Sequence, residues 1–226
     1  MTGEELIAEG QQLARPCVYL VALAAPDTTV AAIWGGEGIV PPPDGPYKHW
    51  LSVNGSFLPS TIGAIPGMLS IYTNEEDGET GVVRIDPSAT LDAAETDGLV
   101  LYAQPALSLP PIDAVFKFGS SSVQNWLAEN DWLPAEGEDE SEYAYNDNFP
   151  DKAIVDVYIN VWQKQLPLYT RSAHAVLGGW HMPWPDGDWY DLLAQTLVAW
   201  TFEEAEPWVE VWRDASKNYT VLQRIT

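Results

Sequence analysis

Residues 173–226 open with AHAVLGGWHMPWPDGDWYDLLAQ and close with PWVEVWRDASKNYTVLQRIT. Residues 31–86 follow the same plan: they open with AAIWGGEGIVPPPDGPYKHWLSVNGSFLP and close with PGMLSIYTNEEDGETGVVRID. In each segment a short apolar run enters a Gly-Gly pair, a Pro-rich loop follows, and a tryptophan then opens a new apolar run. This shared order predicts two related halves, 31–86 and 173–226, that arose by internal duplication.

Length and composition favour one folded body. The chain has 226 residues, of which 46% are hydrophobic and 19% are charged, and this is enough apolar surface for one substantial core. Its 11 Trp and 10 Tyr supply large side chains for that core. We therefore expect a single α+β domain over 1–226, strand-rich, with a few short helices and two halves that close over a shared tryptophan-rich interior.

Local patterns predict the individual elements. Thr2 and Glu5 have the spacing of a capping box, which predicts a helix over 3–14, and capping serines predict a second helix over 120–130. Residues 151–165 fit both a strand and a helical face, and we favour the helix. The Pro-rich segment 105–116 is expected to lack regular structure. Apolar runs bounded by turn residues predict strands at 17–24, 30–34, 49–53, 68–73, 81–85, 99–104, 174–177, 192–197, 208–212 and 219–225.

Three short features have structural interpretations. The pair Gly35-Gly36 predicts a sharp bend, because glycine tolerates positive φ, and it lacks the spacing of a phosphate-binding loop. Cys17 is the single cysteine and lies in an apolar run, so we expect it in the core. Residues 134–150 carry many acidic and few aliphatic residues, which predicts a solvated, mobile loop without the pattern of a calcium-binding loop.

Charge narrows the class of partner. The chain has 33 Asp and Glu against 10 Lys and Arg, which gives a net charge of −23. Such a surface repels nucleic acids and anionic membranes and favours a basic protein partner, although acidity can also serve solubility alone. Acidic residues precede the first apolar run, unlike a secretory leader, and no apolar run is long enough to span a bilayer. We expect a cytoplasmic protein.

Several segments resemble the YwqG-like family, a group of largely uncharacterised bacterial proteins with an internally duplicated α+β fold. The resemblance is carried by AIWGGEG at 32–38, PGMLSIY at 66–72, QPALSLP at 104–110, and HAVLGGWHMPW with DLLAQ within 174–195. It implies no established enzymatic activity. Because some relatives are thought to lie near toxin systems, the resemblance implies an immunity-like or partner-binding role.

The sequence contains no recognisable catalytic motif. His49, His174 and His181 form no close metal-binding pair, and a site made of His181, Asp186 and Asp188 is less favoured than ordinary loop polarity. No serine or cysteine has an evident general base at a recognisable spacing. We therefore expect no catalytic residues, no metal and no cofactor, although an acid/base pair among the many carboxylates has no sequence signature.

The aromatic loop after the second Gly-Gly pair is the best candidate for binding. Its candidate residues are Trp180, His181, Trp184, Asp186, Asp188, Trp189 and Tyr190. Indoles at a loop rim bind partner side chains or sugar faces, whereas the structural alternative is that they fill the space between the halves. Our first hypothesis is a non-enzymatic acidic protein, possibly an immunity protein, that binds a basic protein. The second is a carbohydrate-binding, small-ligand-binding or hydrolytic protein with an aromatic cleft between the halves.

Overall fold

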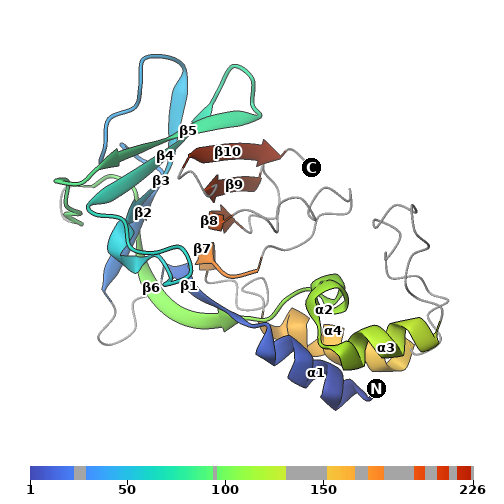
Figure 1. Ribbon diagram of the computed structural model, residues 1–226. Helices are drawn as coiled ribbons and strands as arrows, with labels where there is room; N and C mark the ends of the chain where they lie inside the picture. Colours follow the sequence, from blue (N-terminus) through green and yellow to red (C-terminus); the bar gives the residue numbers. More distant parts are fainter. Residues whose placement is uncertain are drawn as a thin grey trace.

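The computed structural model shows an α+β fold in which a closed barrel of antiparallel strands lies beside a group of helices (Figure 1). It describes residues 1–22, 29–93, 96–130, 152–165, 173–180, 196–201, 208–213 and 218–224. Its helices are α1 (Gly3–Gln12), α2 (Ile112–Phe118), α3 (Ser121–Glu129) and α4 (Lys152–Gln165), with a short 3-10 helix at Gly55–Phe57. Its strands are β1 (Arg15–Val21), β2 (Val30–Trp34), β3 (Tyr47–Asn54), β4 (Met68–Asn74), β5 (Thr80–Asp86), β6 (Leu99–Ser108), β7 (Ala173–Gly178), β8 (Thr196–Thr201), β9 (Trp208–Arg213) and β10 (Tyr219–Arg224).

The strands form one ring in the order β1-β6-β2-β3-β4-β5-β10-β9-β8-β7, which closes because β7 pairs with β1. Strands β2 to β5 pair in chain order, and strands β7 to β10 do the same. The two meanders meet where β5 pairs with β10. Strands β1 and β6 pair with each other and fill the remaining gap between β7 and β2.

Both Gly-Gly pairs lie at strand ends in the left-handed region of backbone space. Gly35 and Gly36 follow β2 with φ of 64° and 66°, and Gly178 and Gly179 end β7 with φ of 66° and 83°. These angles are strained for residues with a Cβ atom, so glycine is required for the turns. The predicted bend at Gly35-Gly36 is confirmed.

Among the described residues the barrel core is mostly aliphatic, and Trp34 and Trp50 pack against it; the side chains of 181–208, which carry four further tryptophans, lie outside the described part, so the expected tryptophan-rich interior stays a prediction. The inward positions of alternate residues hold mostly Val, Leu, Ile and Ala, among them Leu20, Leu51 and Ile71. Trp34 and Trp50 lie at the margin of this core with their rings 5.3 Å apart, while Trp212 packs on the outer face with the buried Cys17.

The expectation that residues 105–116 lack regular structure is also wrong, because β6 continues to Ser108 and α2 begins at Ile112. Strand β6 pairs with β2 only over Leu99–Tyr102, and beyond that point it pairs with β1 alone. Pro105 therefore lies where one edge of the strand is unpaired, and its missing N–H costs little there. Pro111 is the N-cap of α2, where the helix needs no N–H, and its carbonyl oxygen accepts from Val115 N at 3.2 Å.

Most other predicted elements are confirmed within one to three residues. The capping box of α1 forms, with Thr2 N donating to Glu5 Oε2 at 2.7 Å and Glu5 N donating to Thr2 Oγ1 at 3.2 Å. Residues 152–165 are helical, as favoured. Residues 192–195 of a predicted strand and all of the predicted acidic loop, 134–150, lie outside the described residues, and the described strand β8 continues to Thr201.

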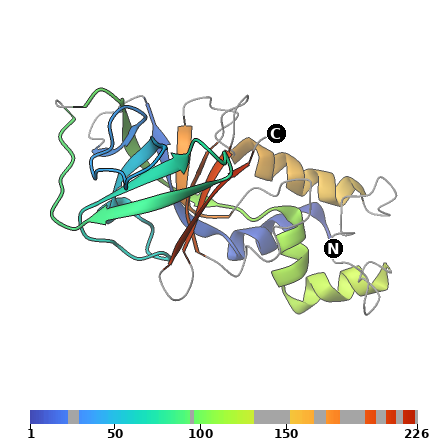
Figure 2. The same ribbon diagram turned by 90° about the horizontal axis from the view of Figure 1, so that it is seen from above.

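The helices lie together on one side of the barrel, next to the points where α1 leads into β1 and β6 leads toward α2 (Figures 1 and 2). They have a core of their own, which includes Leu6, Val115, Leu127 and Tyr158. The closest approach is between α1 and α4, where a Cβ atom on Gly10 would lie 2.5 Å from the Tyr158 ring. Within the described part of the chain, no helix has the length and apolar character needed to cross a membrane.

We expect Gly10→Ala to destabilise the protein, although alanine normally stabilises a helix interior by about 1 kcal/mol. The added methyl group would meet Tyr158, which is fully buried and hydrogen-bonded, so the expected loss is about 1–3 kcal/mol. Urea denaturation measures this free energy of unfolding. Ala8 is an exposed position on the same helix. There Ala8→Gly should lower the free energy of unfolding by about 1 kcal/mol, which is the ordinary helix preference for alanine over glycine. Stabilisation by Gly10→Ala would contradict this account of the packing.

Candidate functional site

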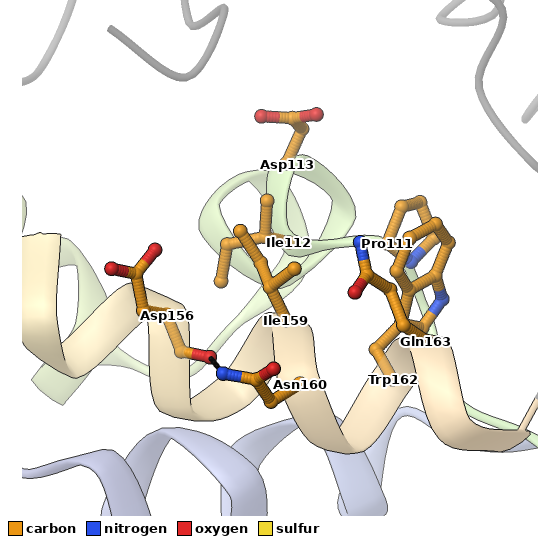
Figure 3. A pocket seen from close by; sticks show the side chains of 8 residues that line it. All are labelled: Pro111, Ile112, Asp113, Asp156, Ile159, Asn160, Trp162 and Gln163. Carbon is orange, nitrogen blue, oxygen red and sulfur yellow. Dashed lines mark hydrogen bonds between the residues drawn. The ribbon is translucent and has the colours of Figure 1, made fainter. Parts of the chain in front are cut away.

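A groove lies in the helical group between the first turn of α2 and one face of α4 (Figure 3). Its volume is about 470 Å³, which is in the range of small-ligand pockets. It is lined by Pro111, Ile112 and Asp113 from the start of α2 and by Asp156, Ile159, Asn160, Trp162 and Gln163 from α4. The lining thus combines an apolar floor with carboxyl, amide and indole groups.

Tyr158 fixes the relative position of the two helices that form the groove. Its hydroxyl donates a hydrogen bond of 2.7 Å to the carbonyl oxygen of Pro110, immediately before α2. Val155 and Tyr158 face the helical core and are 1% and 0% exposed. Asp156 and Asn160 lie on a different face of α4 from these two residues. Because the face with Val155 and Tyr158 is buried in the helical core, the face with Asp156 and Asn160 points toward the groove.

Asp113 has an unusual electrostatic environment. Burial raises the pKa of its carboxyl group to about 7, and the bond with its own backbone N–H opposes this shift only in part. Its Oδ1 atom is buried and accepts no hydrogen bond. A buried carboxylate with few donors and no counter-charge costs free energy. The charged form of Asp113 is therefore poorly stabilised in the folded protein.

The α4 side of the groove is polar. Lys152 Nζ lies 3.4 Å from Asp156 Oδ1 in an exposed pair, and Asn160 Nδ2 donates to the carbonyl oxygen of Asp156 at 2.8 Å. The carboxyl groups of Asp113 and Asp156 do not point toward each other (Figure 3). None of the eight lining residues is Lys or Arg. This arrangement suits an organic cation or a polyhydroxyl ligand better than paired acid/base chemistry.

A second polar cluster lies on the outer face of β3 and β4. His49 Nε2 is 2.8 Å from Ser52 Oγ, which is 2.6 Å from Ser70 Oγ. His49 Nδ1 is 2.9 Å from the carbonyl oxygen of Gly35, so it must be the protonated nitrogen and Nε2 must accept from Ser52. The Ser52 hydroxyl also accepts from the backbone N–H of Ile39 at 3.2 Å. Ser70 must donate to Ser52 Oγ, because the one Ser52 hydroxyl proton goes to His49. The single donor and both acceptor positions of the Ser52 hydroxyl are then used.

The contact between Ser52 and His49 anchors a loop, and the Ser52 hydroxyl is not accessible as a catalytic nucleophile would be. The side chains of His49, Ser52, Ser70 and Tyr72 are all buried. Ser70 Oγ accepts from Val40 N at 3.0 Å, and the Tyr72 hydroxyl donates to Val40 O at 2.5 Å. Burial lowers the pKa of His49, and its hydrogen bond to the Gly35 carbonyl opposes this shift. The cluster therefore fastens the Pro-rich loop after Gly35-Gly36 and requires a neutral imidazole.

Of the predicted binding residues, only Trp180 is described. It is 4% exposed, and its Nε1 donates to the carbonyl oxygen of Leu13 at 2.8 Å. The Arg15 guanidinium lies 3.5 Å from the centre of a Trp180 ring, and Ser108 Oγ accepts from the Trp180 backbone N–H at 3.1 Å. Trp180 thus joins the barrel to the helical group. His181, Trp184, Asp186, Asp188, Trp189 and Tyr190 lie outside the described residues, and their role in binding stays a prediction.

Sequence reasoning missed the groove. Asp113 lies in the Pro-rich segment that we expected to be irregular, and the pattern 151–165 gave no reason to single out Asp156, Asn160 or Trp162. A helix start after Pro111, with an acidic residue in the first turn, is the signal that could have located Asp113. In the part of the chain that the structure describes, no group of three His, Cys, Asp or Glu side chains is placed to hold a metal ion.

Comparison of the chain with models of protein families, with curated proteins and with solved structures gives no match. The resemblance to the YwqG-like family therefore still depends on the short motifs quoted above. The argument for function accordingly starts from the groove and from the charge of the chain.

We expect Asp113→Asn to stabilise the protein, and to do so more strongly at higher pH. The pKa of Asp113 is raised from 3.8 to about 7 in the folded protein, so the unfolded chain loses this proton first and stability falls as the pH rises through that window. With 1.36 kcal/mol per pKa unit and about two units between pH 5 and the raised pKa, the gain should be about 3 kcal/mol larger near pH 8 than near pH 5. Urea denaturation at both pH values measures it, and the exposed-site variant Glu75→Gln should show no such difference. An equal gain at the two pH values would contradict a buried, unpaired carboxylate.

We expect His49 to make the protein less stable in acid. Its pKa is lowered from 6.5, so the unfolded chain binds a proton first and stability is lost as the pH falls below about 6.5. His49→Asn keeps a donor near the Gly35 carbonyl but cannot titrate. It should cost about 1–3 kcal/mol at neutral pH, because Ser52 loses its acceptor, and the difference from the natural protein should shrink in acid. Thermal unfolding against pH measures this; a constant difference would show that His49 is not held neutral.

Proposed function

We propose that this protein is a non-enzymatic, acidic binding protein of the cytoplasm whose partner is a basic protein, in the manner of an immunity protein. The observation that carries the proposal is the α2–α4 groove, which holds two carboxyl groups and no Lys or Arg in its lining. The net charge of −23 supports the same class of partner. The immunity type is what the resemblance to the YwqG-like family implies.

The overall charge and the groove would act over different distances. The overall negative charge attracts a basic protein from a distance and raises the rate of association. This attraction is screened beyond about 8 Å at physiological ionic strength. The groove acts only on contact, where Ile112, Ile159 and Trp162 offer apolar surface beside the carboxyl groups. Charge would therefore set the on-rate, and the groove would set the short-range fit.

Two features of the described residues support a role without catalysis. The Ser52–His49 contact has the geometry of a nucleophile and its base, but both side chains are buried and Ser52 Oγ is fully engaged. In the groove, the Asp113 and Asp156 carboxyl groups do not face a common point (Figure 3). Neither arrangement places an accessible acid and base to act on one substrate.

The lining also supports a second candidate function, the binding of a carbohydrate or other small polar ligand. Trp162 lies in the same groove as the amide side chains of Asn160 and Gln163 and the carboxyl group of Asp156. An indole face with several hydrogen-bonding groups is a common arrangement for holding a sugar ring. This candidate differs from the first in predicting a neutral ligand whose binding is insensitive to salt.

We also infer that the two halves of the barrel arose by duplication. The support is that β2–β5 and β7–β10 are meanders of equal strand number that meet antiparallel at β5 and β10. Each meander has its Gly-Gly pair at the end of its first strand with positive φ. An experimental structure in which 31–86 and 173–226 do not superpose strand on strand would contradict the inference.

We expect the immobilised protein to capture a basic protein from a lysate of the organism that encodes it. Surface plasmon resonance with the purified partner should show an association rate that falls about tenfold or more from low to physiological salt, because the attraction is electrostatic. Neutral saccharides should leave the melting temperature unchanged. Capture of acidic proteins only, or a rate independent of salt, would contradict the proposal. A rise in melting temperature with a saccharide would instead favour the second candidate.

A further inference from the structure

The chain contains one Asn-Gly dipeptide, Asn54-Gly55, and it lies where β3 ends and the 3-10 helix begins. In such a dipeptide the backbone nitrogen of the glycine can attack the amide carbon of the asparagine side chain, and ammonia is then lost without an enzyme. Glycine favours this reaction because it has no side chain to block the approach and the widest choice of backbone conformations. Asn54 is therefore the asparagine of this chain whose sequence context most favours deamidation.

The fold holds this dipeptide in an unreactive conformation. Asn54 has φ of −73° and ψ of 116°, and this extended ψ turns the Gly55 nitrogen away from the Asn54 side chain. Gly55 N donates a hydrogen bond to Gly67 O at 2.9 Å, and Gly55 O accepts from Ile65 N at 3.1 Å. The nitrogen can attack only after it gives up its proton and the backbone rotates about the Asn54 Cα–C bond, so both hydrogen bonds must break first.

Packing around Gly55 opposes that rotation. Gly55 is buried, and a Cβ atom on it would collide with the carbonyl oxygen of Ile65. Leu58 and Ile65 belong to the barrel core, and Ile62 packs against it. Arg213 at the end of β9 also donates a hydrogen bond of 3.3 Å to the Ile62 carbonyl oxygen. The dipeptide therefore becomes reactive only when segment 55–65 separates from the barrel.

We propose that Asn54 is a deamidation site that the fold keeps closed, and that it reacts when segment 55–65 separates from the barrel. The inference does not depend on the proposed function. In the first step a bond forms between Gly55 N and Asn54 Cγ, the bond from Cγ to Nδ2 breaks, and the amide nitrogen leaves as ammonia with the Gly55 proton. Water then opens the succinimide ring at one of its two carbonyl groups, and it is the only co-reactant.

The two products of ring opening affect the fold differently. Aspartate can still accept from Ser56 N and Ser56 Oγ, as Asn54 Oδ1 does at 3.0 and 2.7 Å, since Asp and Asn are equally good N-caps. In isoaspartate the main chain runs through the former side chain and is one carbon longer. That carbon shifts Gly55 relative to Gly67 and Ile65, so segment 55–65 cannot restore both hydrogen bonds. Formation of isoaspartate would therefore make the separation irreversible.

The first test compares the rate of deamidation in the folded and the unfolded protein. The full chain is incubated near pH 8 with and without unfolding concentrations of urea, beside a synthetic peptide of residues 49–60, and mass spectrometry follows the mass gain at Asn54. The unfolded chain should match the peptide in urea. The folded chain should react about tenfold or more slowly than the peptide, because it reacts only while it is open. Equal rates in the folded chain and the peptide would overturn the proposal.

Two variants separate local opening from global unfolding. Ile62→Ala weakens the packing of segment 55–65 on the core, so it should raise the rate in the folded protein about fivefold or more and leave the rate in urea unchanged. Gly10→Ala destabilises the helical group instead and should leave both rates unchanged. An unaltered rate in Ile62→Ala, or an equal acceleration by Gly10→Ala, would rule out the local route.

Hydrogen exchange tests the effect of the isoaspartyl product. The isoaspartyl protein is separated by chromatography and compared with Asn54→Asp, which carries the aspartate product with an unchanged main chain. The amide hydrogens of Gly55 and Ile65 should exchange about tenfold or more faster in the isoaspartyl protein, and at nearly the natural rate in Asn54→Asp. Retained protection in the isoaspartyl protein would refute the claim that this product keeps the segment open.

Discussion

The pairing of β1 with both β6 and β7 is the constraint on which the rest of the structure depends. It closes the ring, and closure removes the unpaired strand edges that an open sheet would expose. It also fixes which residues face inward, since a shift of one residue would move Val18 and Leu20 out of the aliphatic core. Because α1 runs directly into β1 and β6 runs toward α2, the same pair of strands brings two helices to one side of the barrel.

The groove follows from that arrangement through a few close contacts. Among the described elements, helix α4 packs mainly against α1 and also against α2. Tyr158 provides both contacts: its ring lies over Gly10, and its hydroxyl holds the Pro110 carbonyl. Trp180 joins the barrel to the same region through Leu13 and Arg15. The groove lining is therefore held by buried side chains on the opposite faces of its own helices.

The sequence predicted those elements whose signal is local. Asp77-Gly78 specifies the β4–β5 turn, where the Asp77 carboxylate accepts the backbone N–H groups of Glu79 and Thr80 at 2.9 Å. Segment 105–116 was missed because Pro105 is tolerated only where β6 has a single partner, and that depends on distant strands. Asp113 could not be singled out, because its burial is a result of tertiary packing that the pattern of segment 105–116 does not carry. The predicted aromatic loop, apart from Trp180, lies outside the described residues.

The surface carboxylates and the carboxyl group of Asp113 differ in their physical effect. An excess of 23 negative charges attracts any basic protein, so it would raise association rates without selecting among basic partners. Exposed carboxylates are also screened by salt and solvated by water, which makes each contribute little on contact. Asp113 differs, because burial raises the pKa of its carboxyl group and its Oδ1 atom accepts no hydrogen bond. Its charged form therefore costs the folded protein a free energy that an exposed carboxylate does not cost.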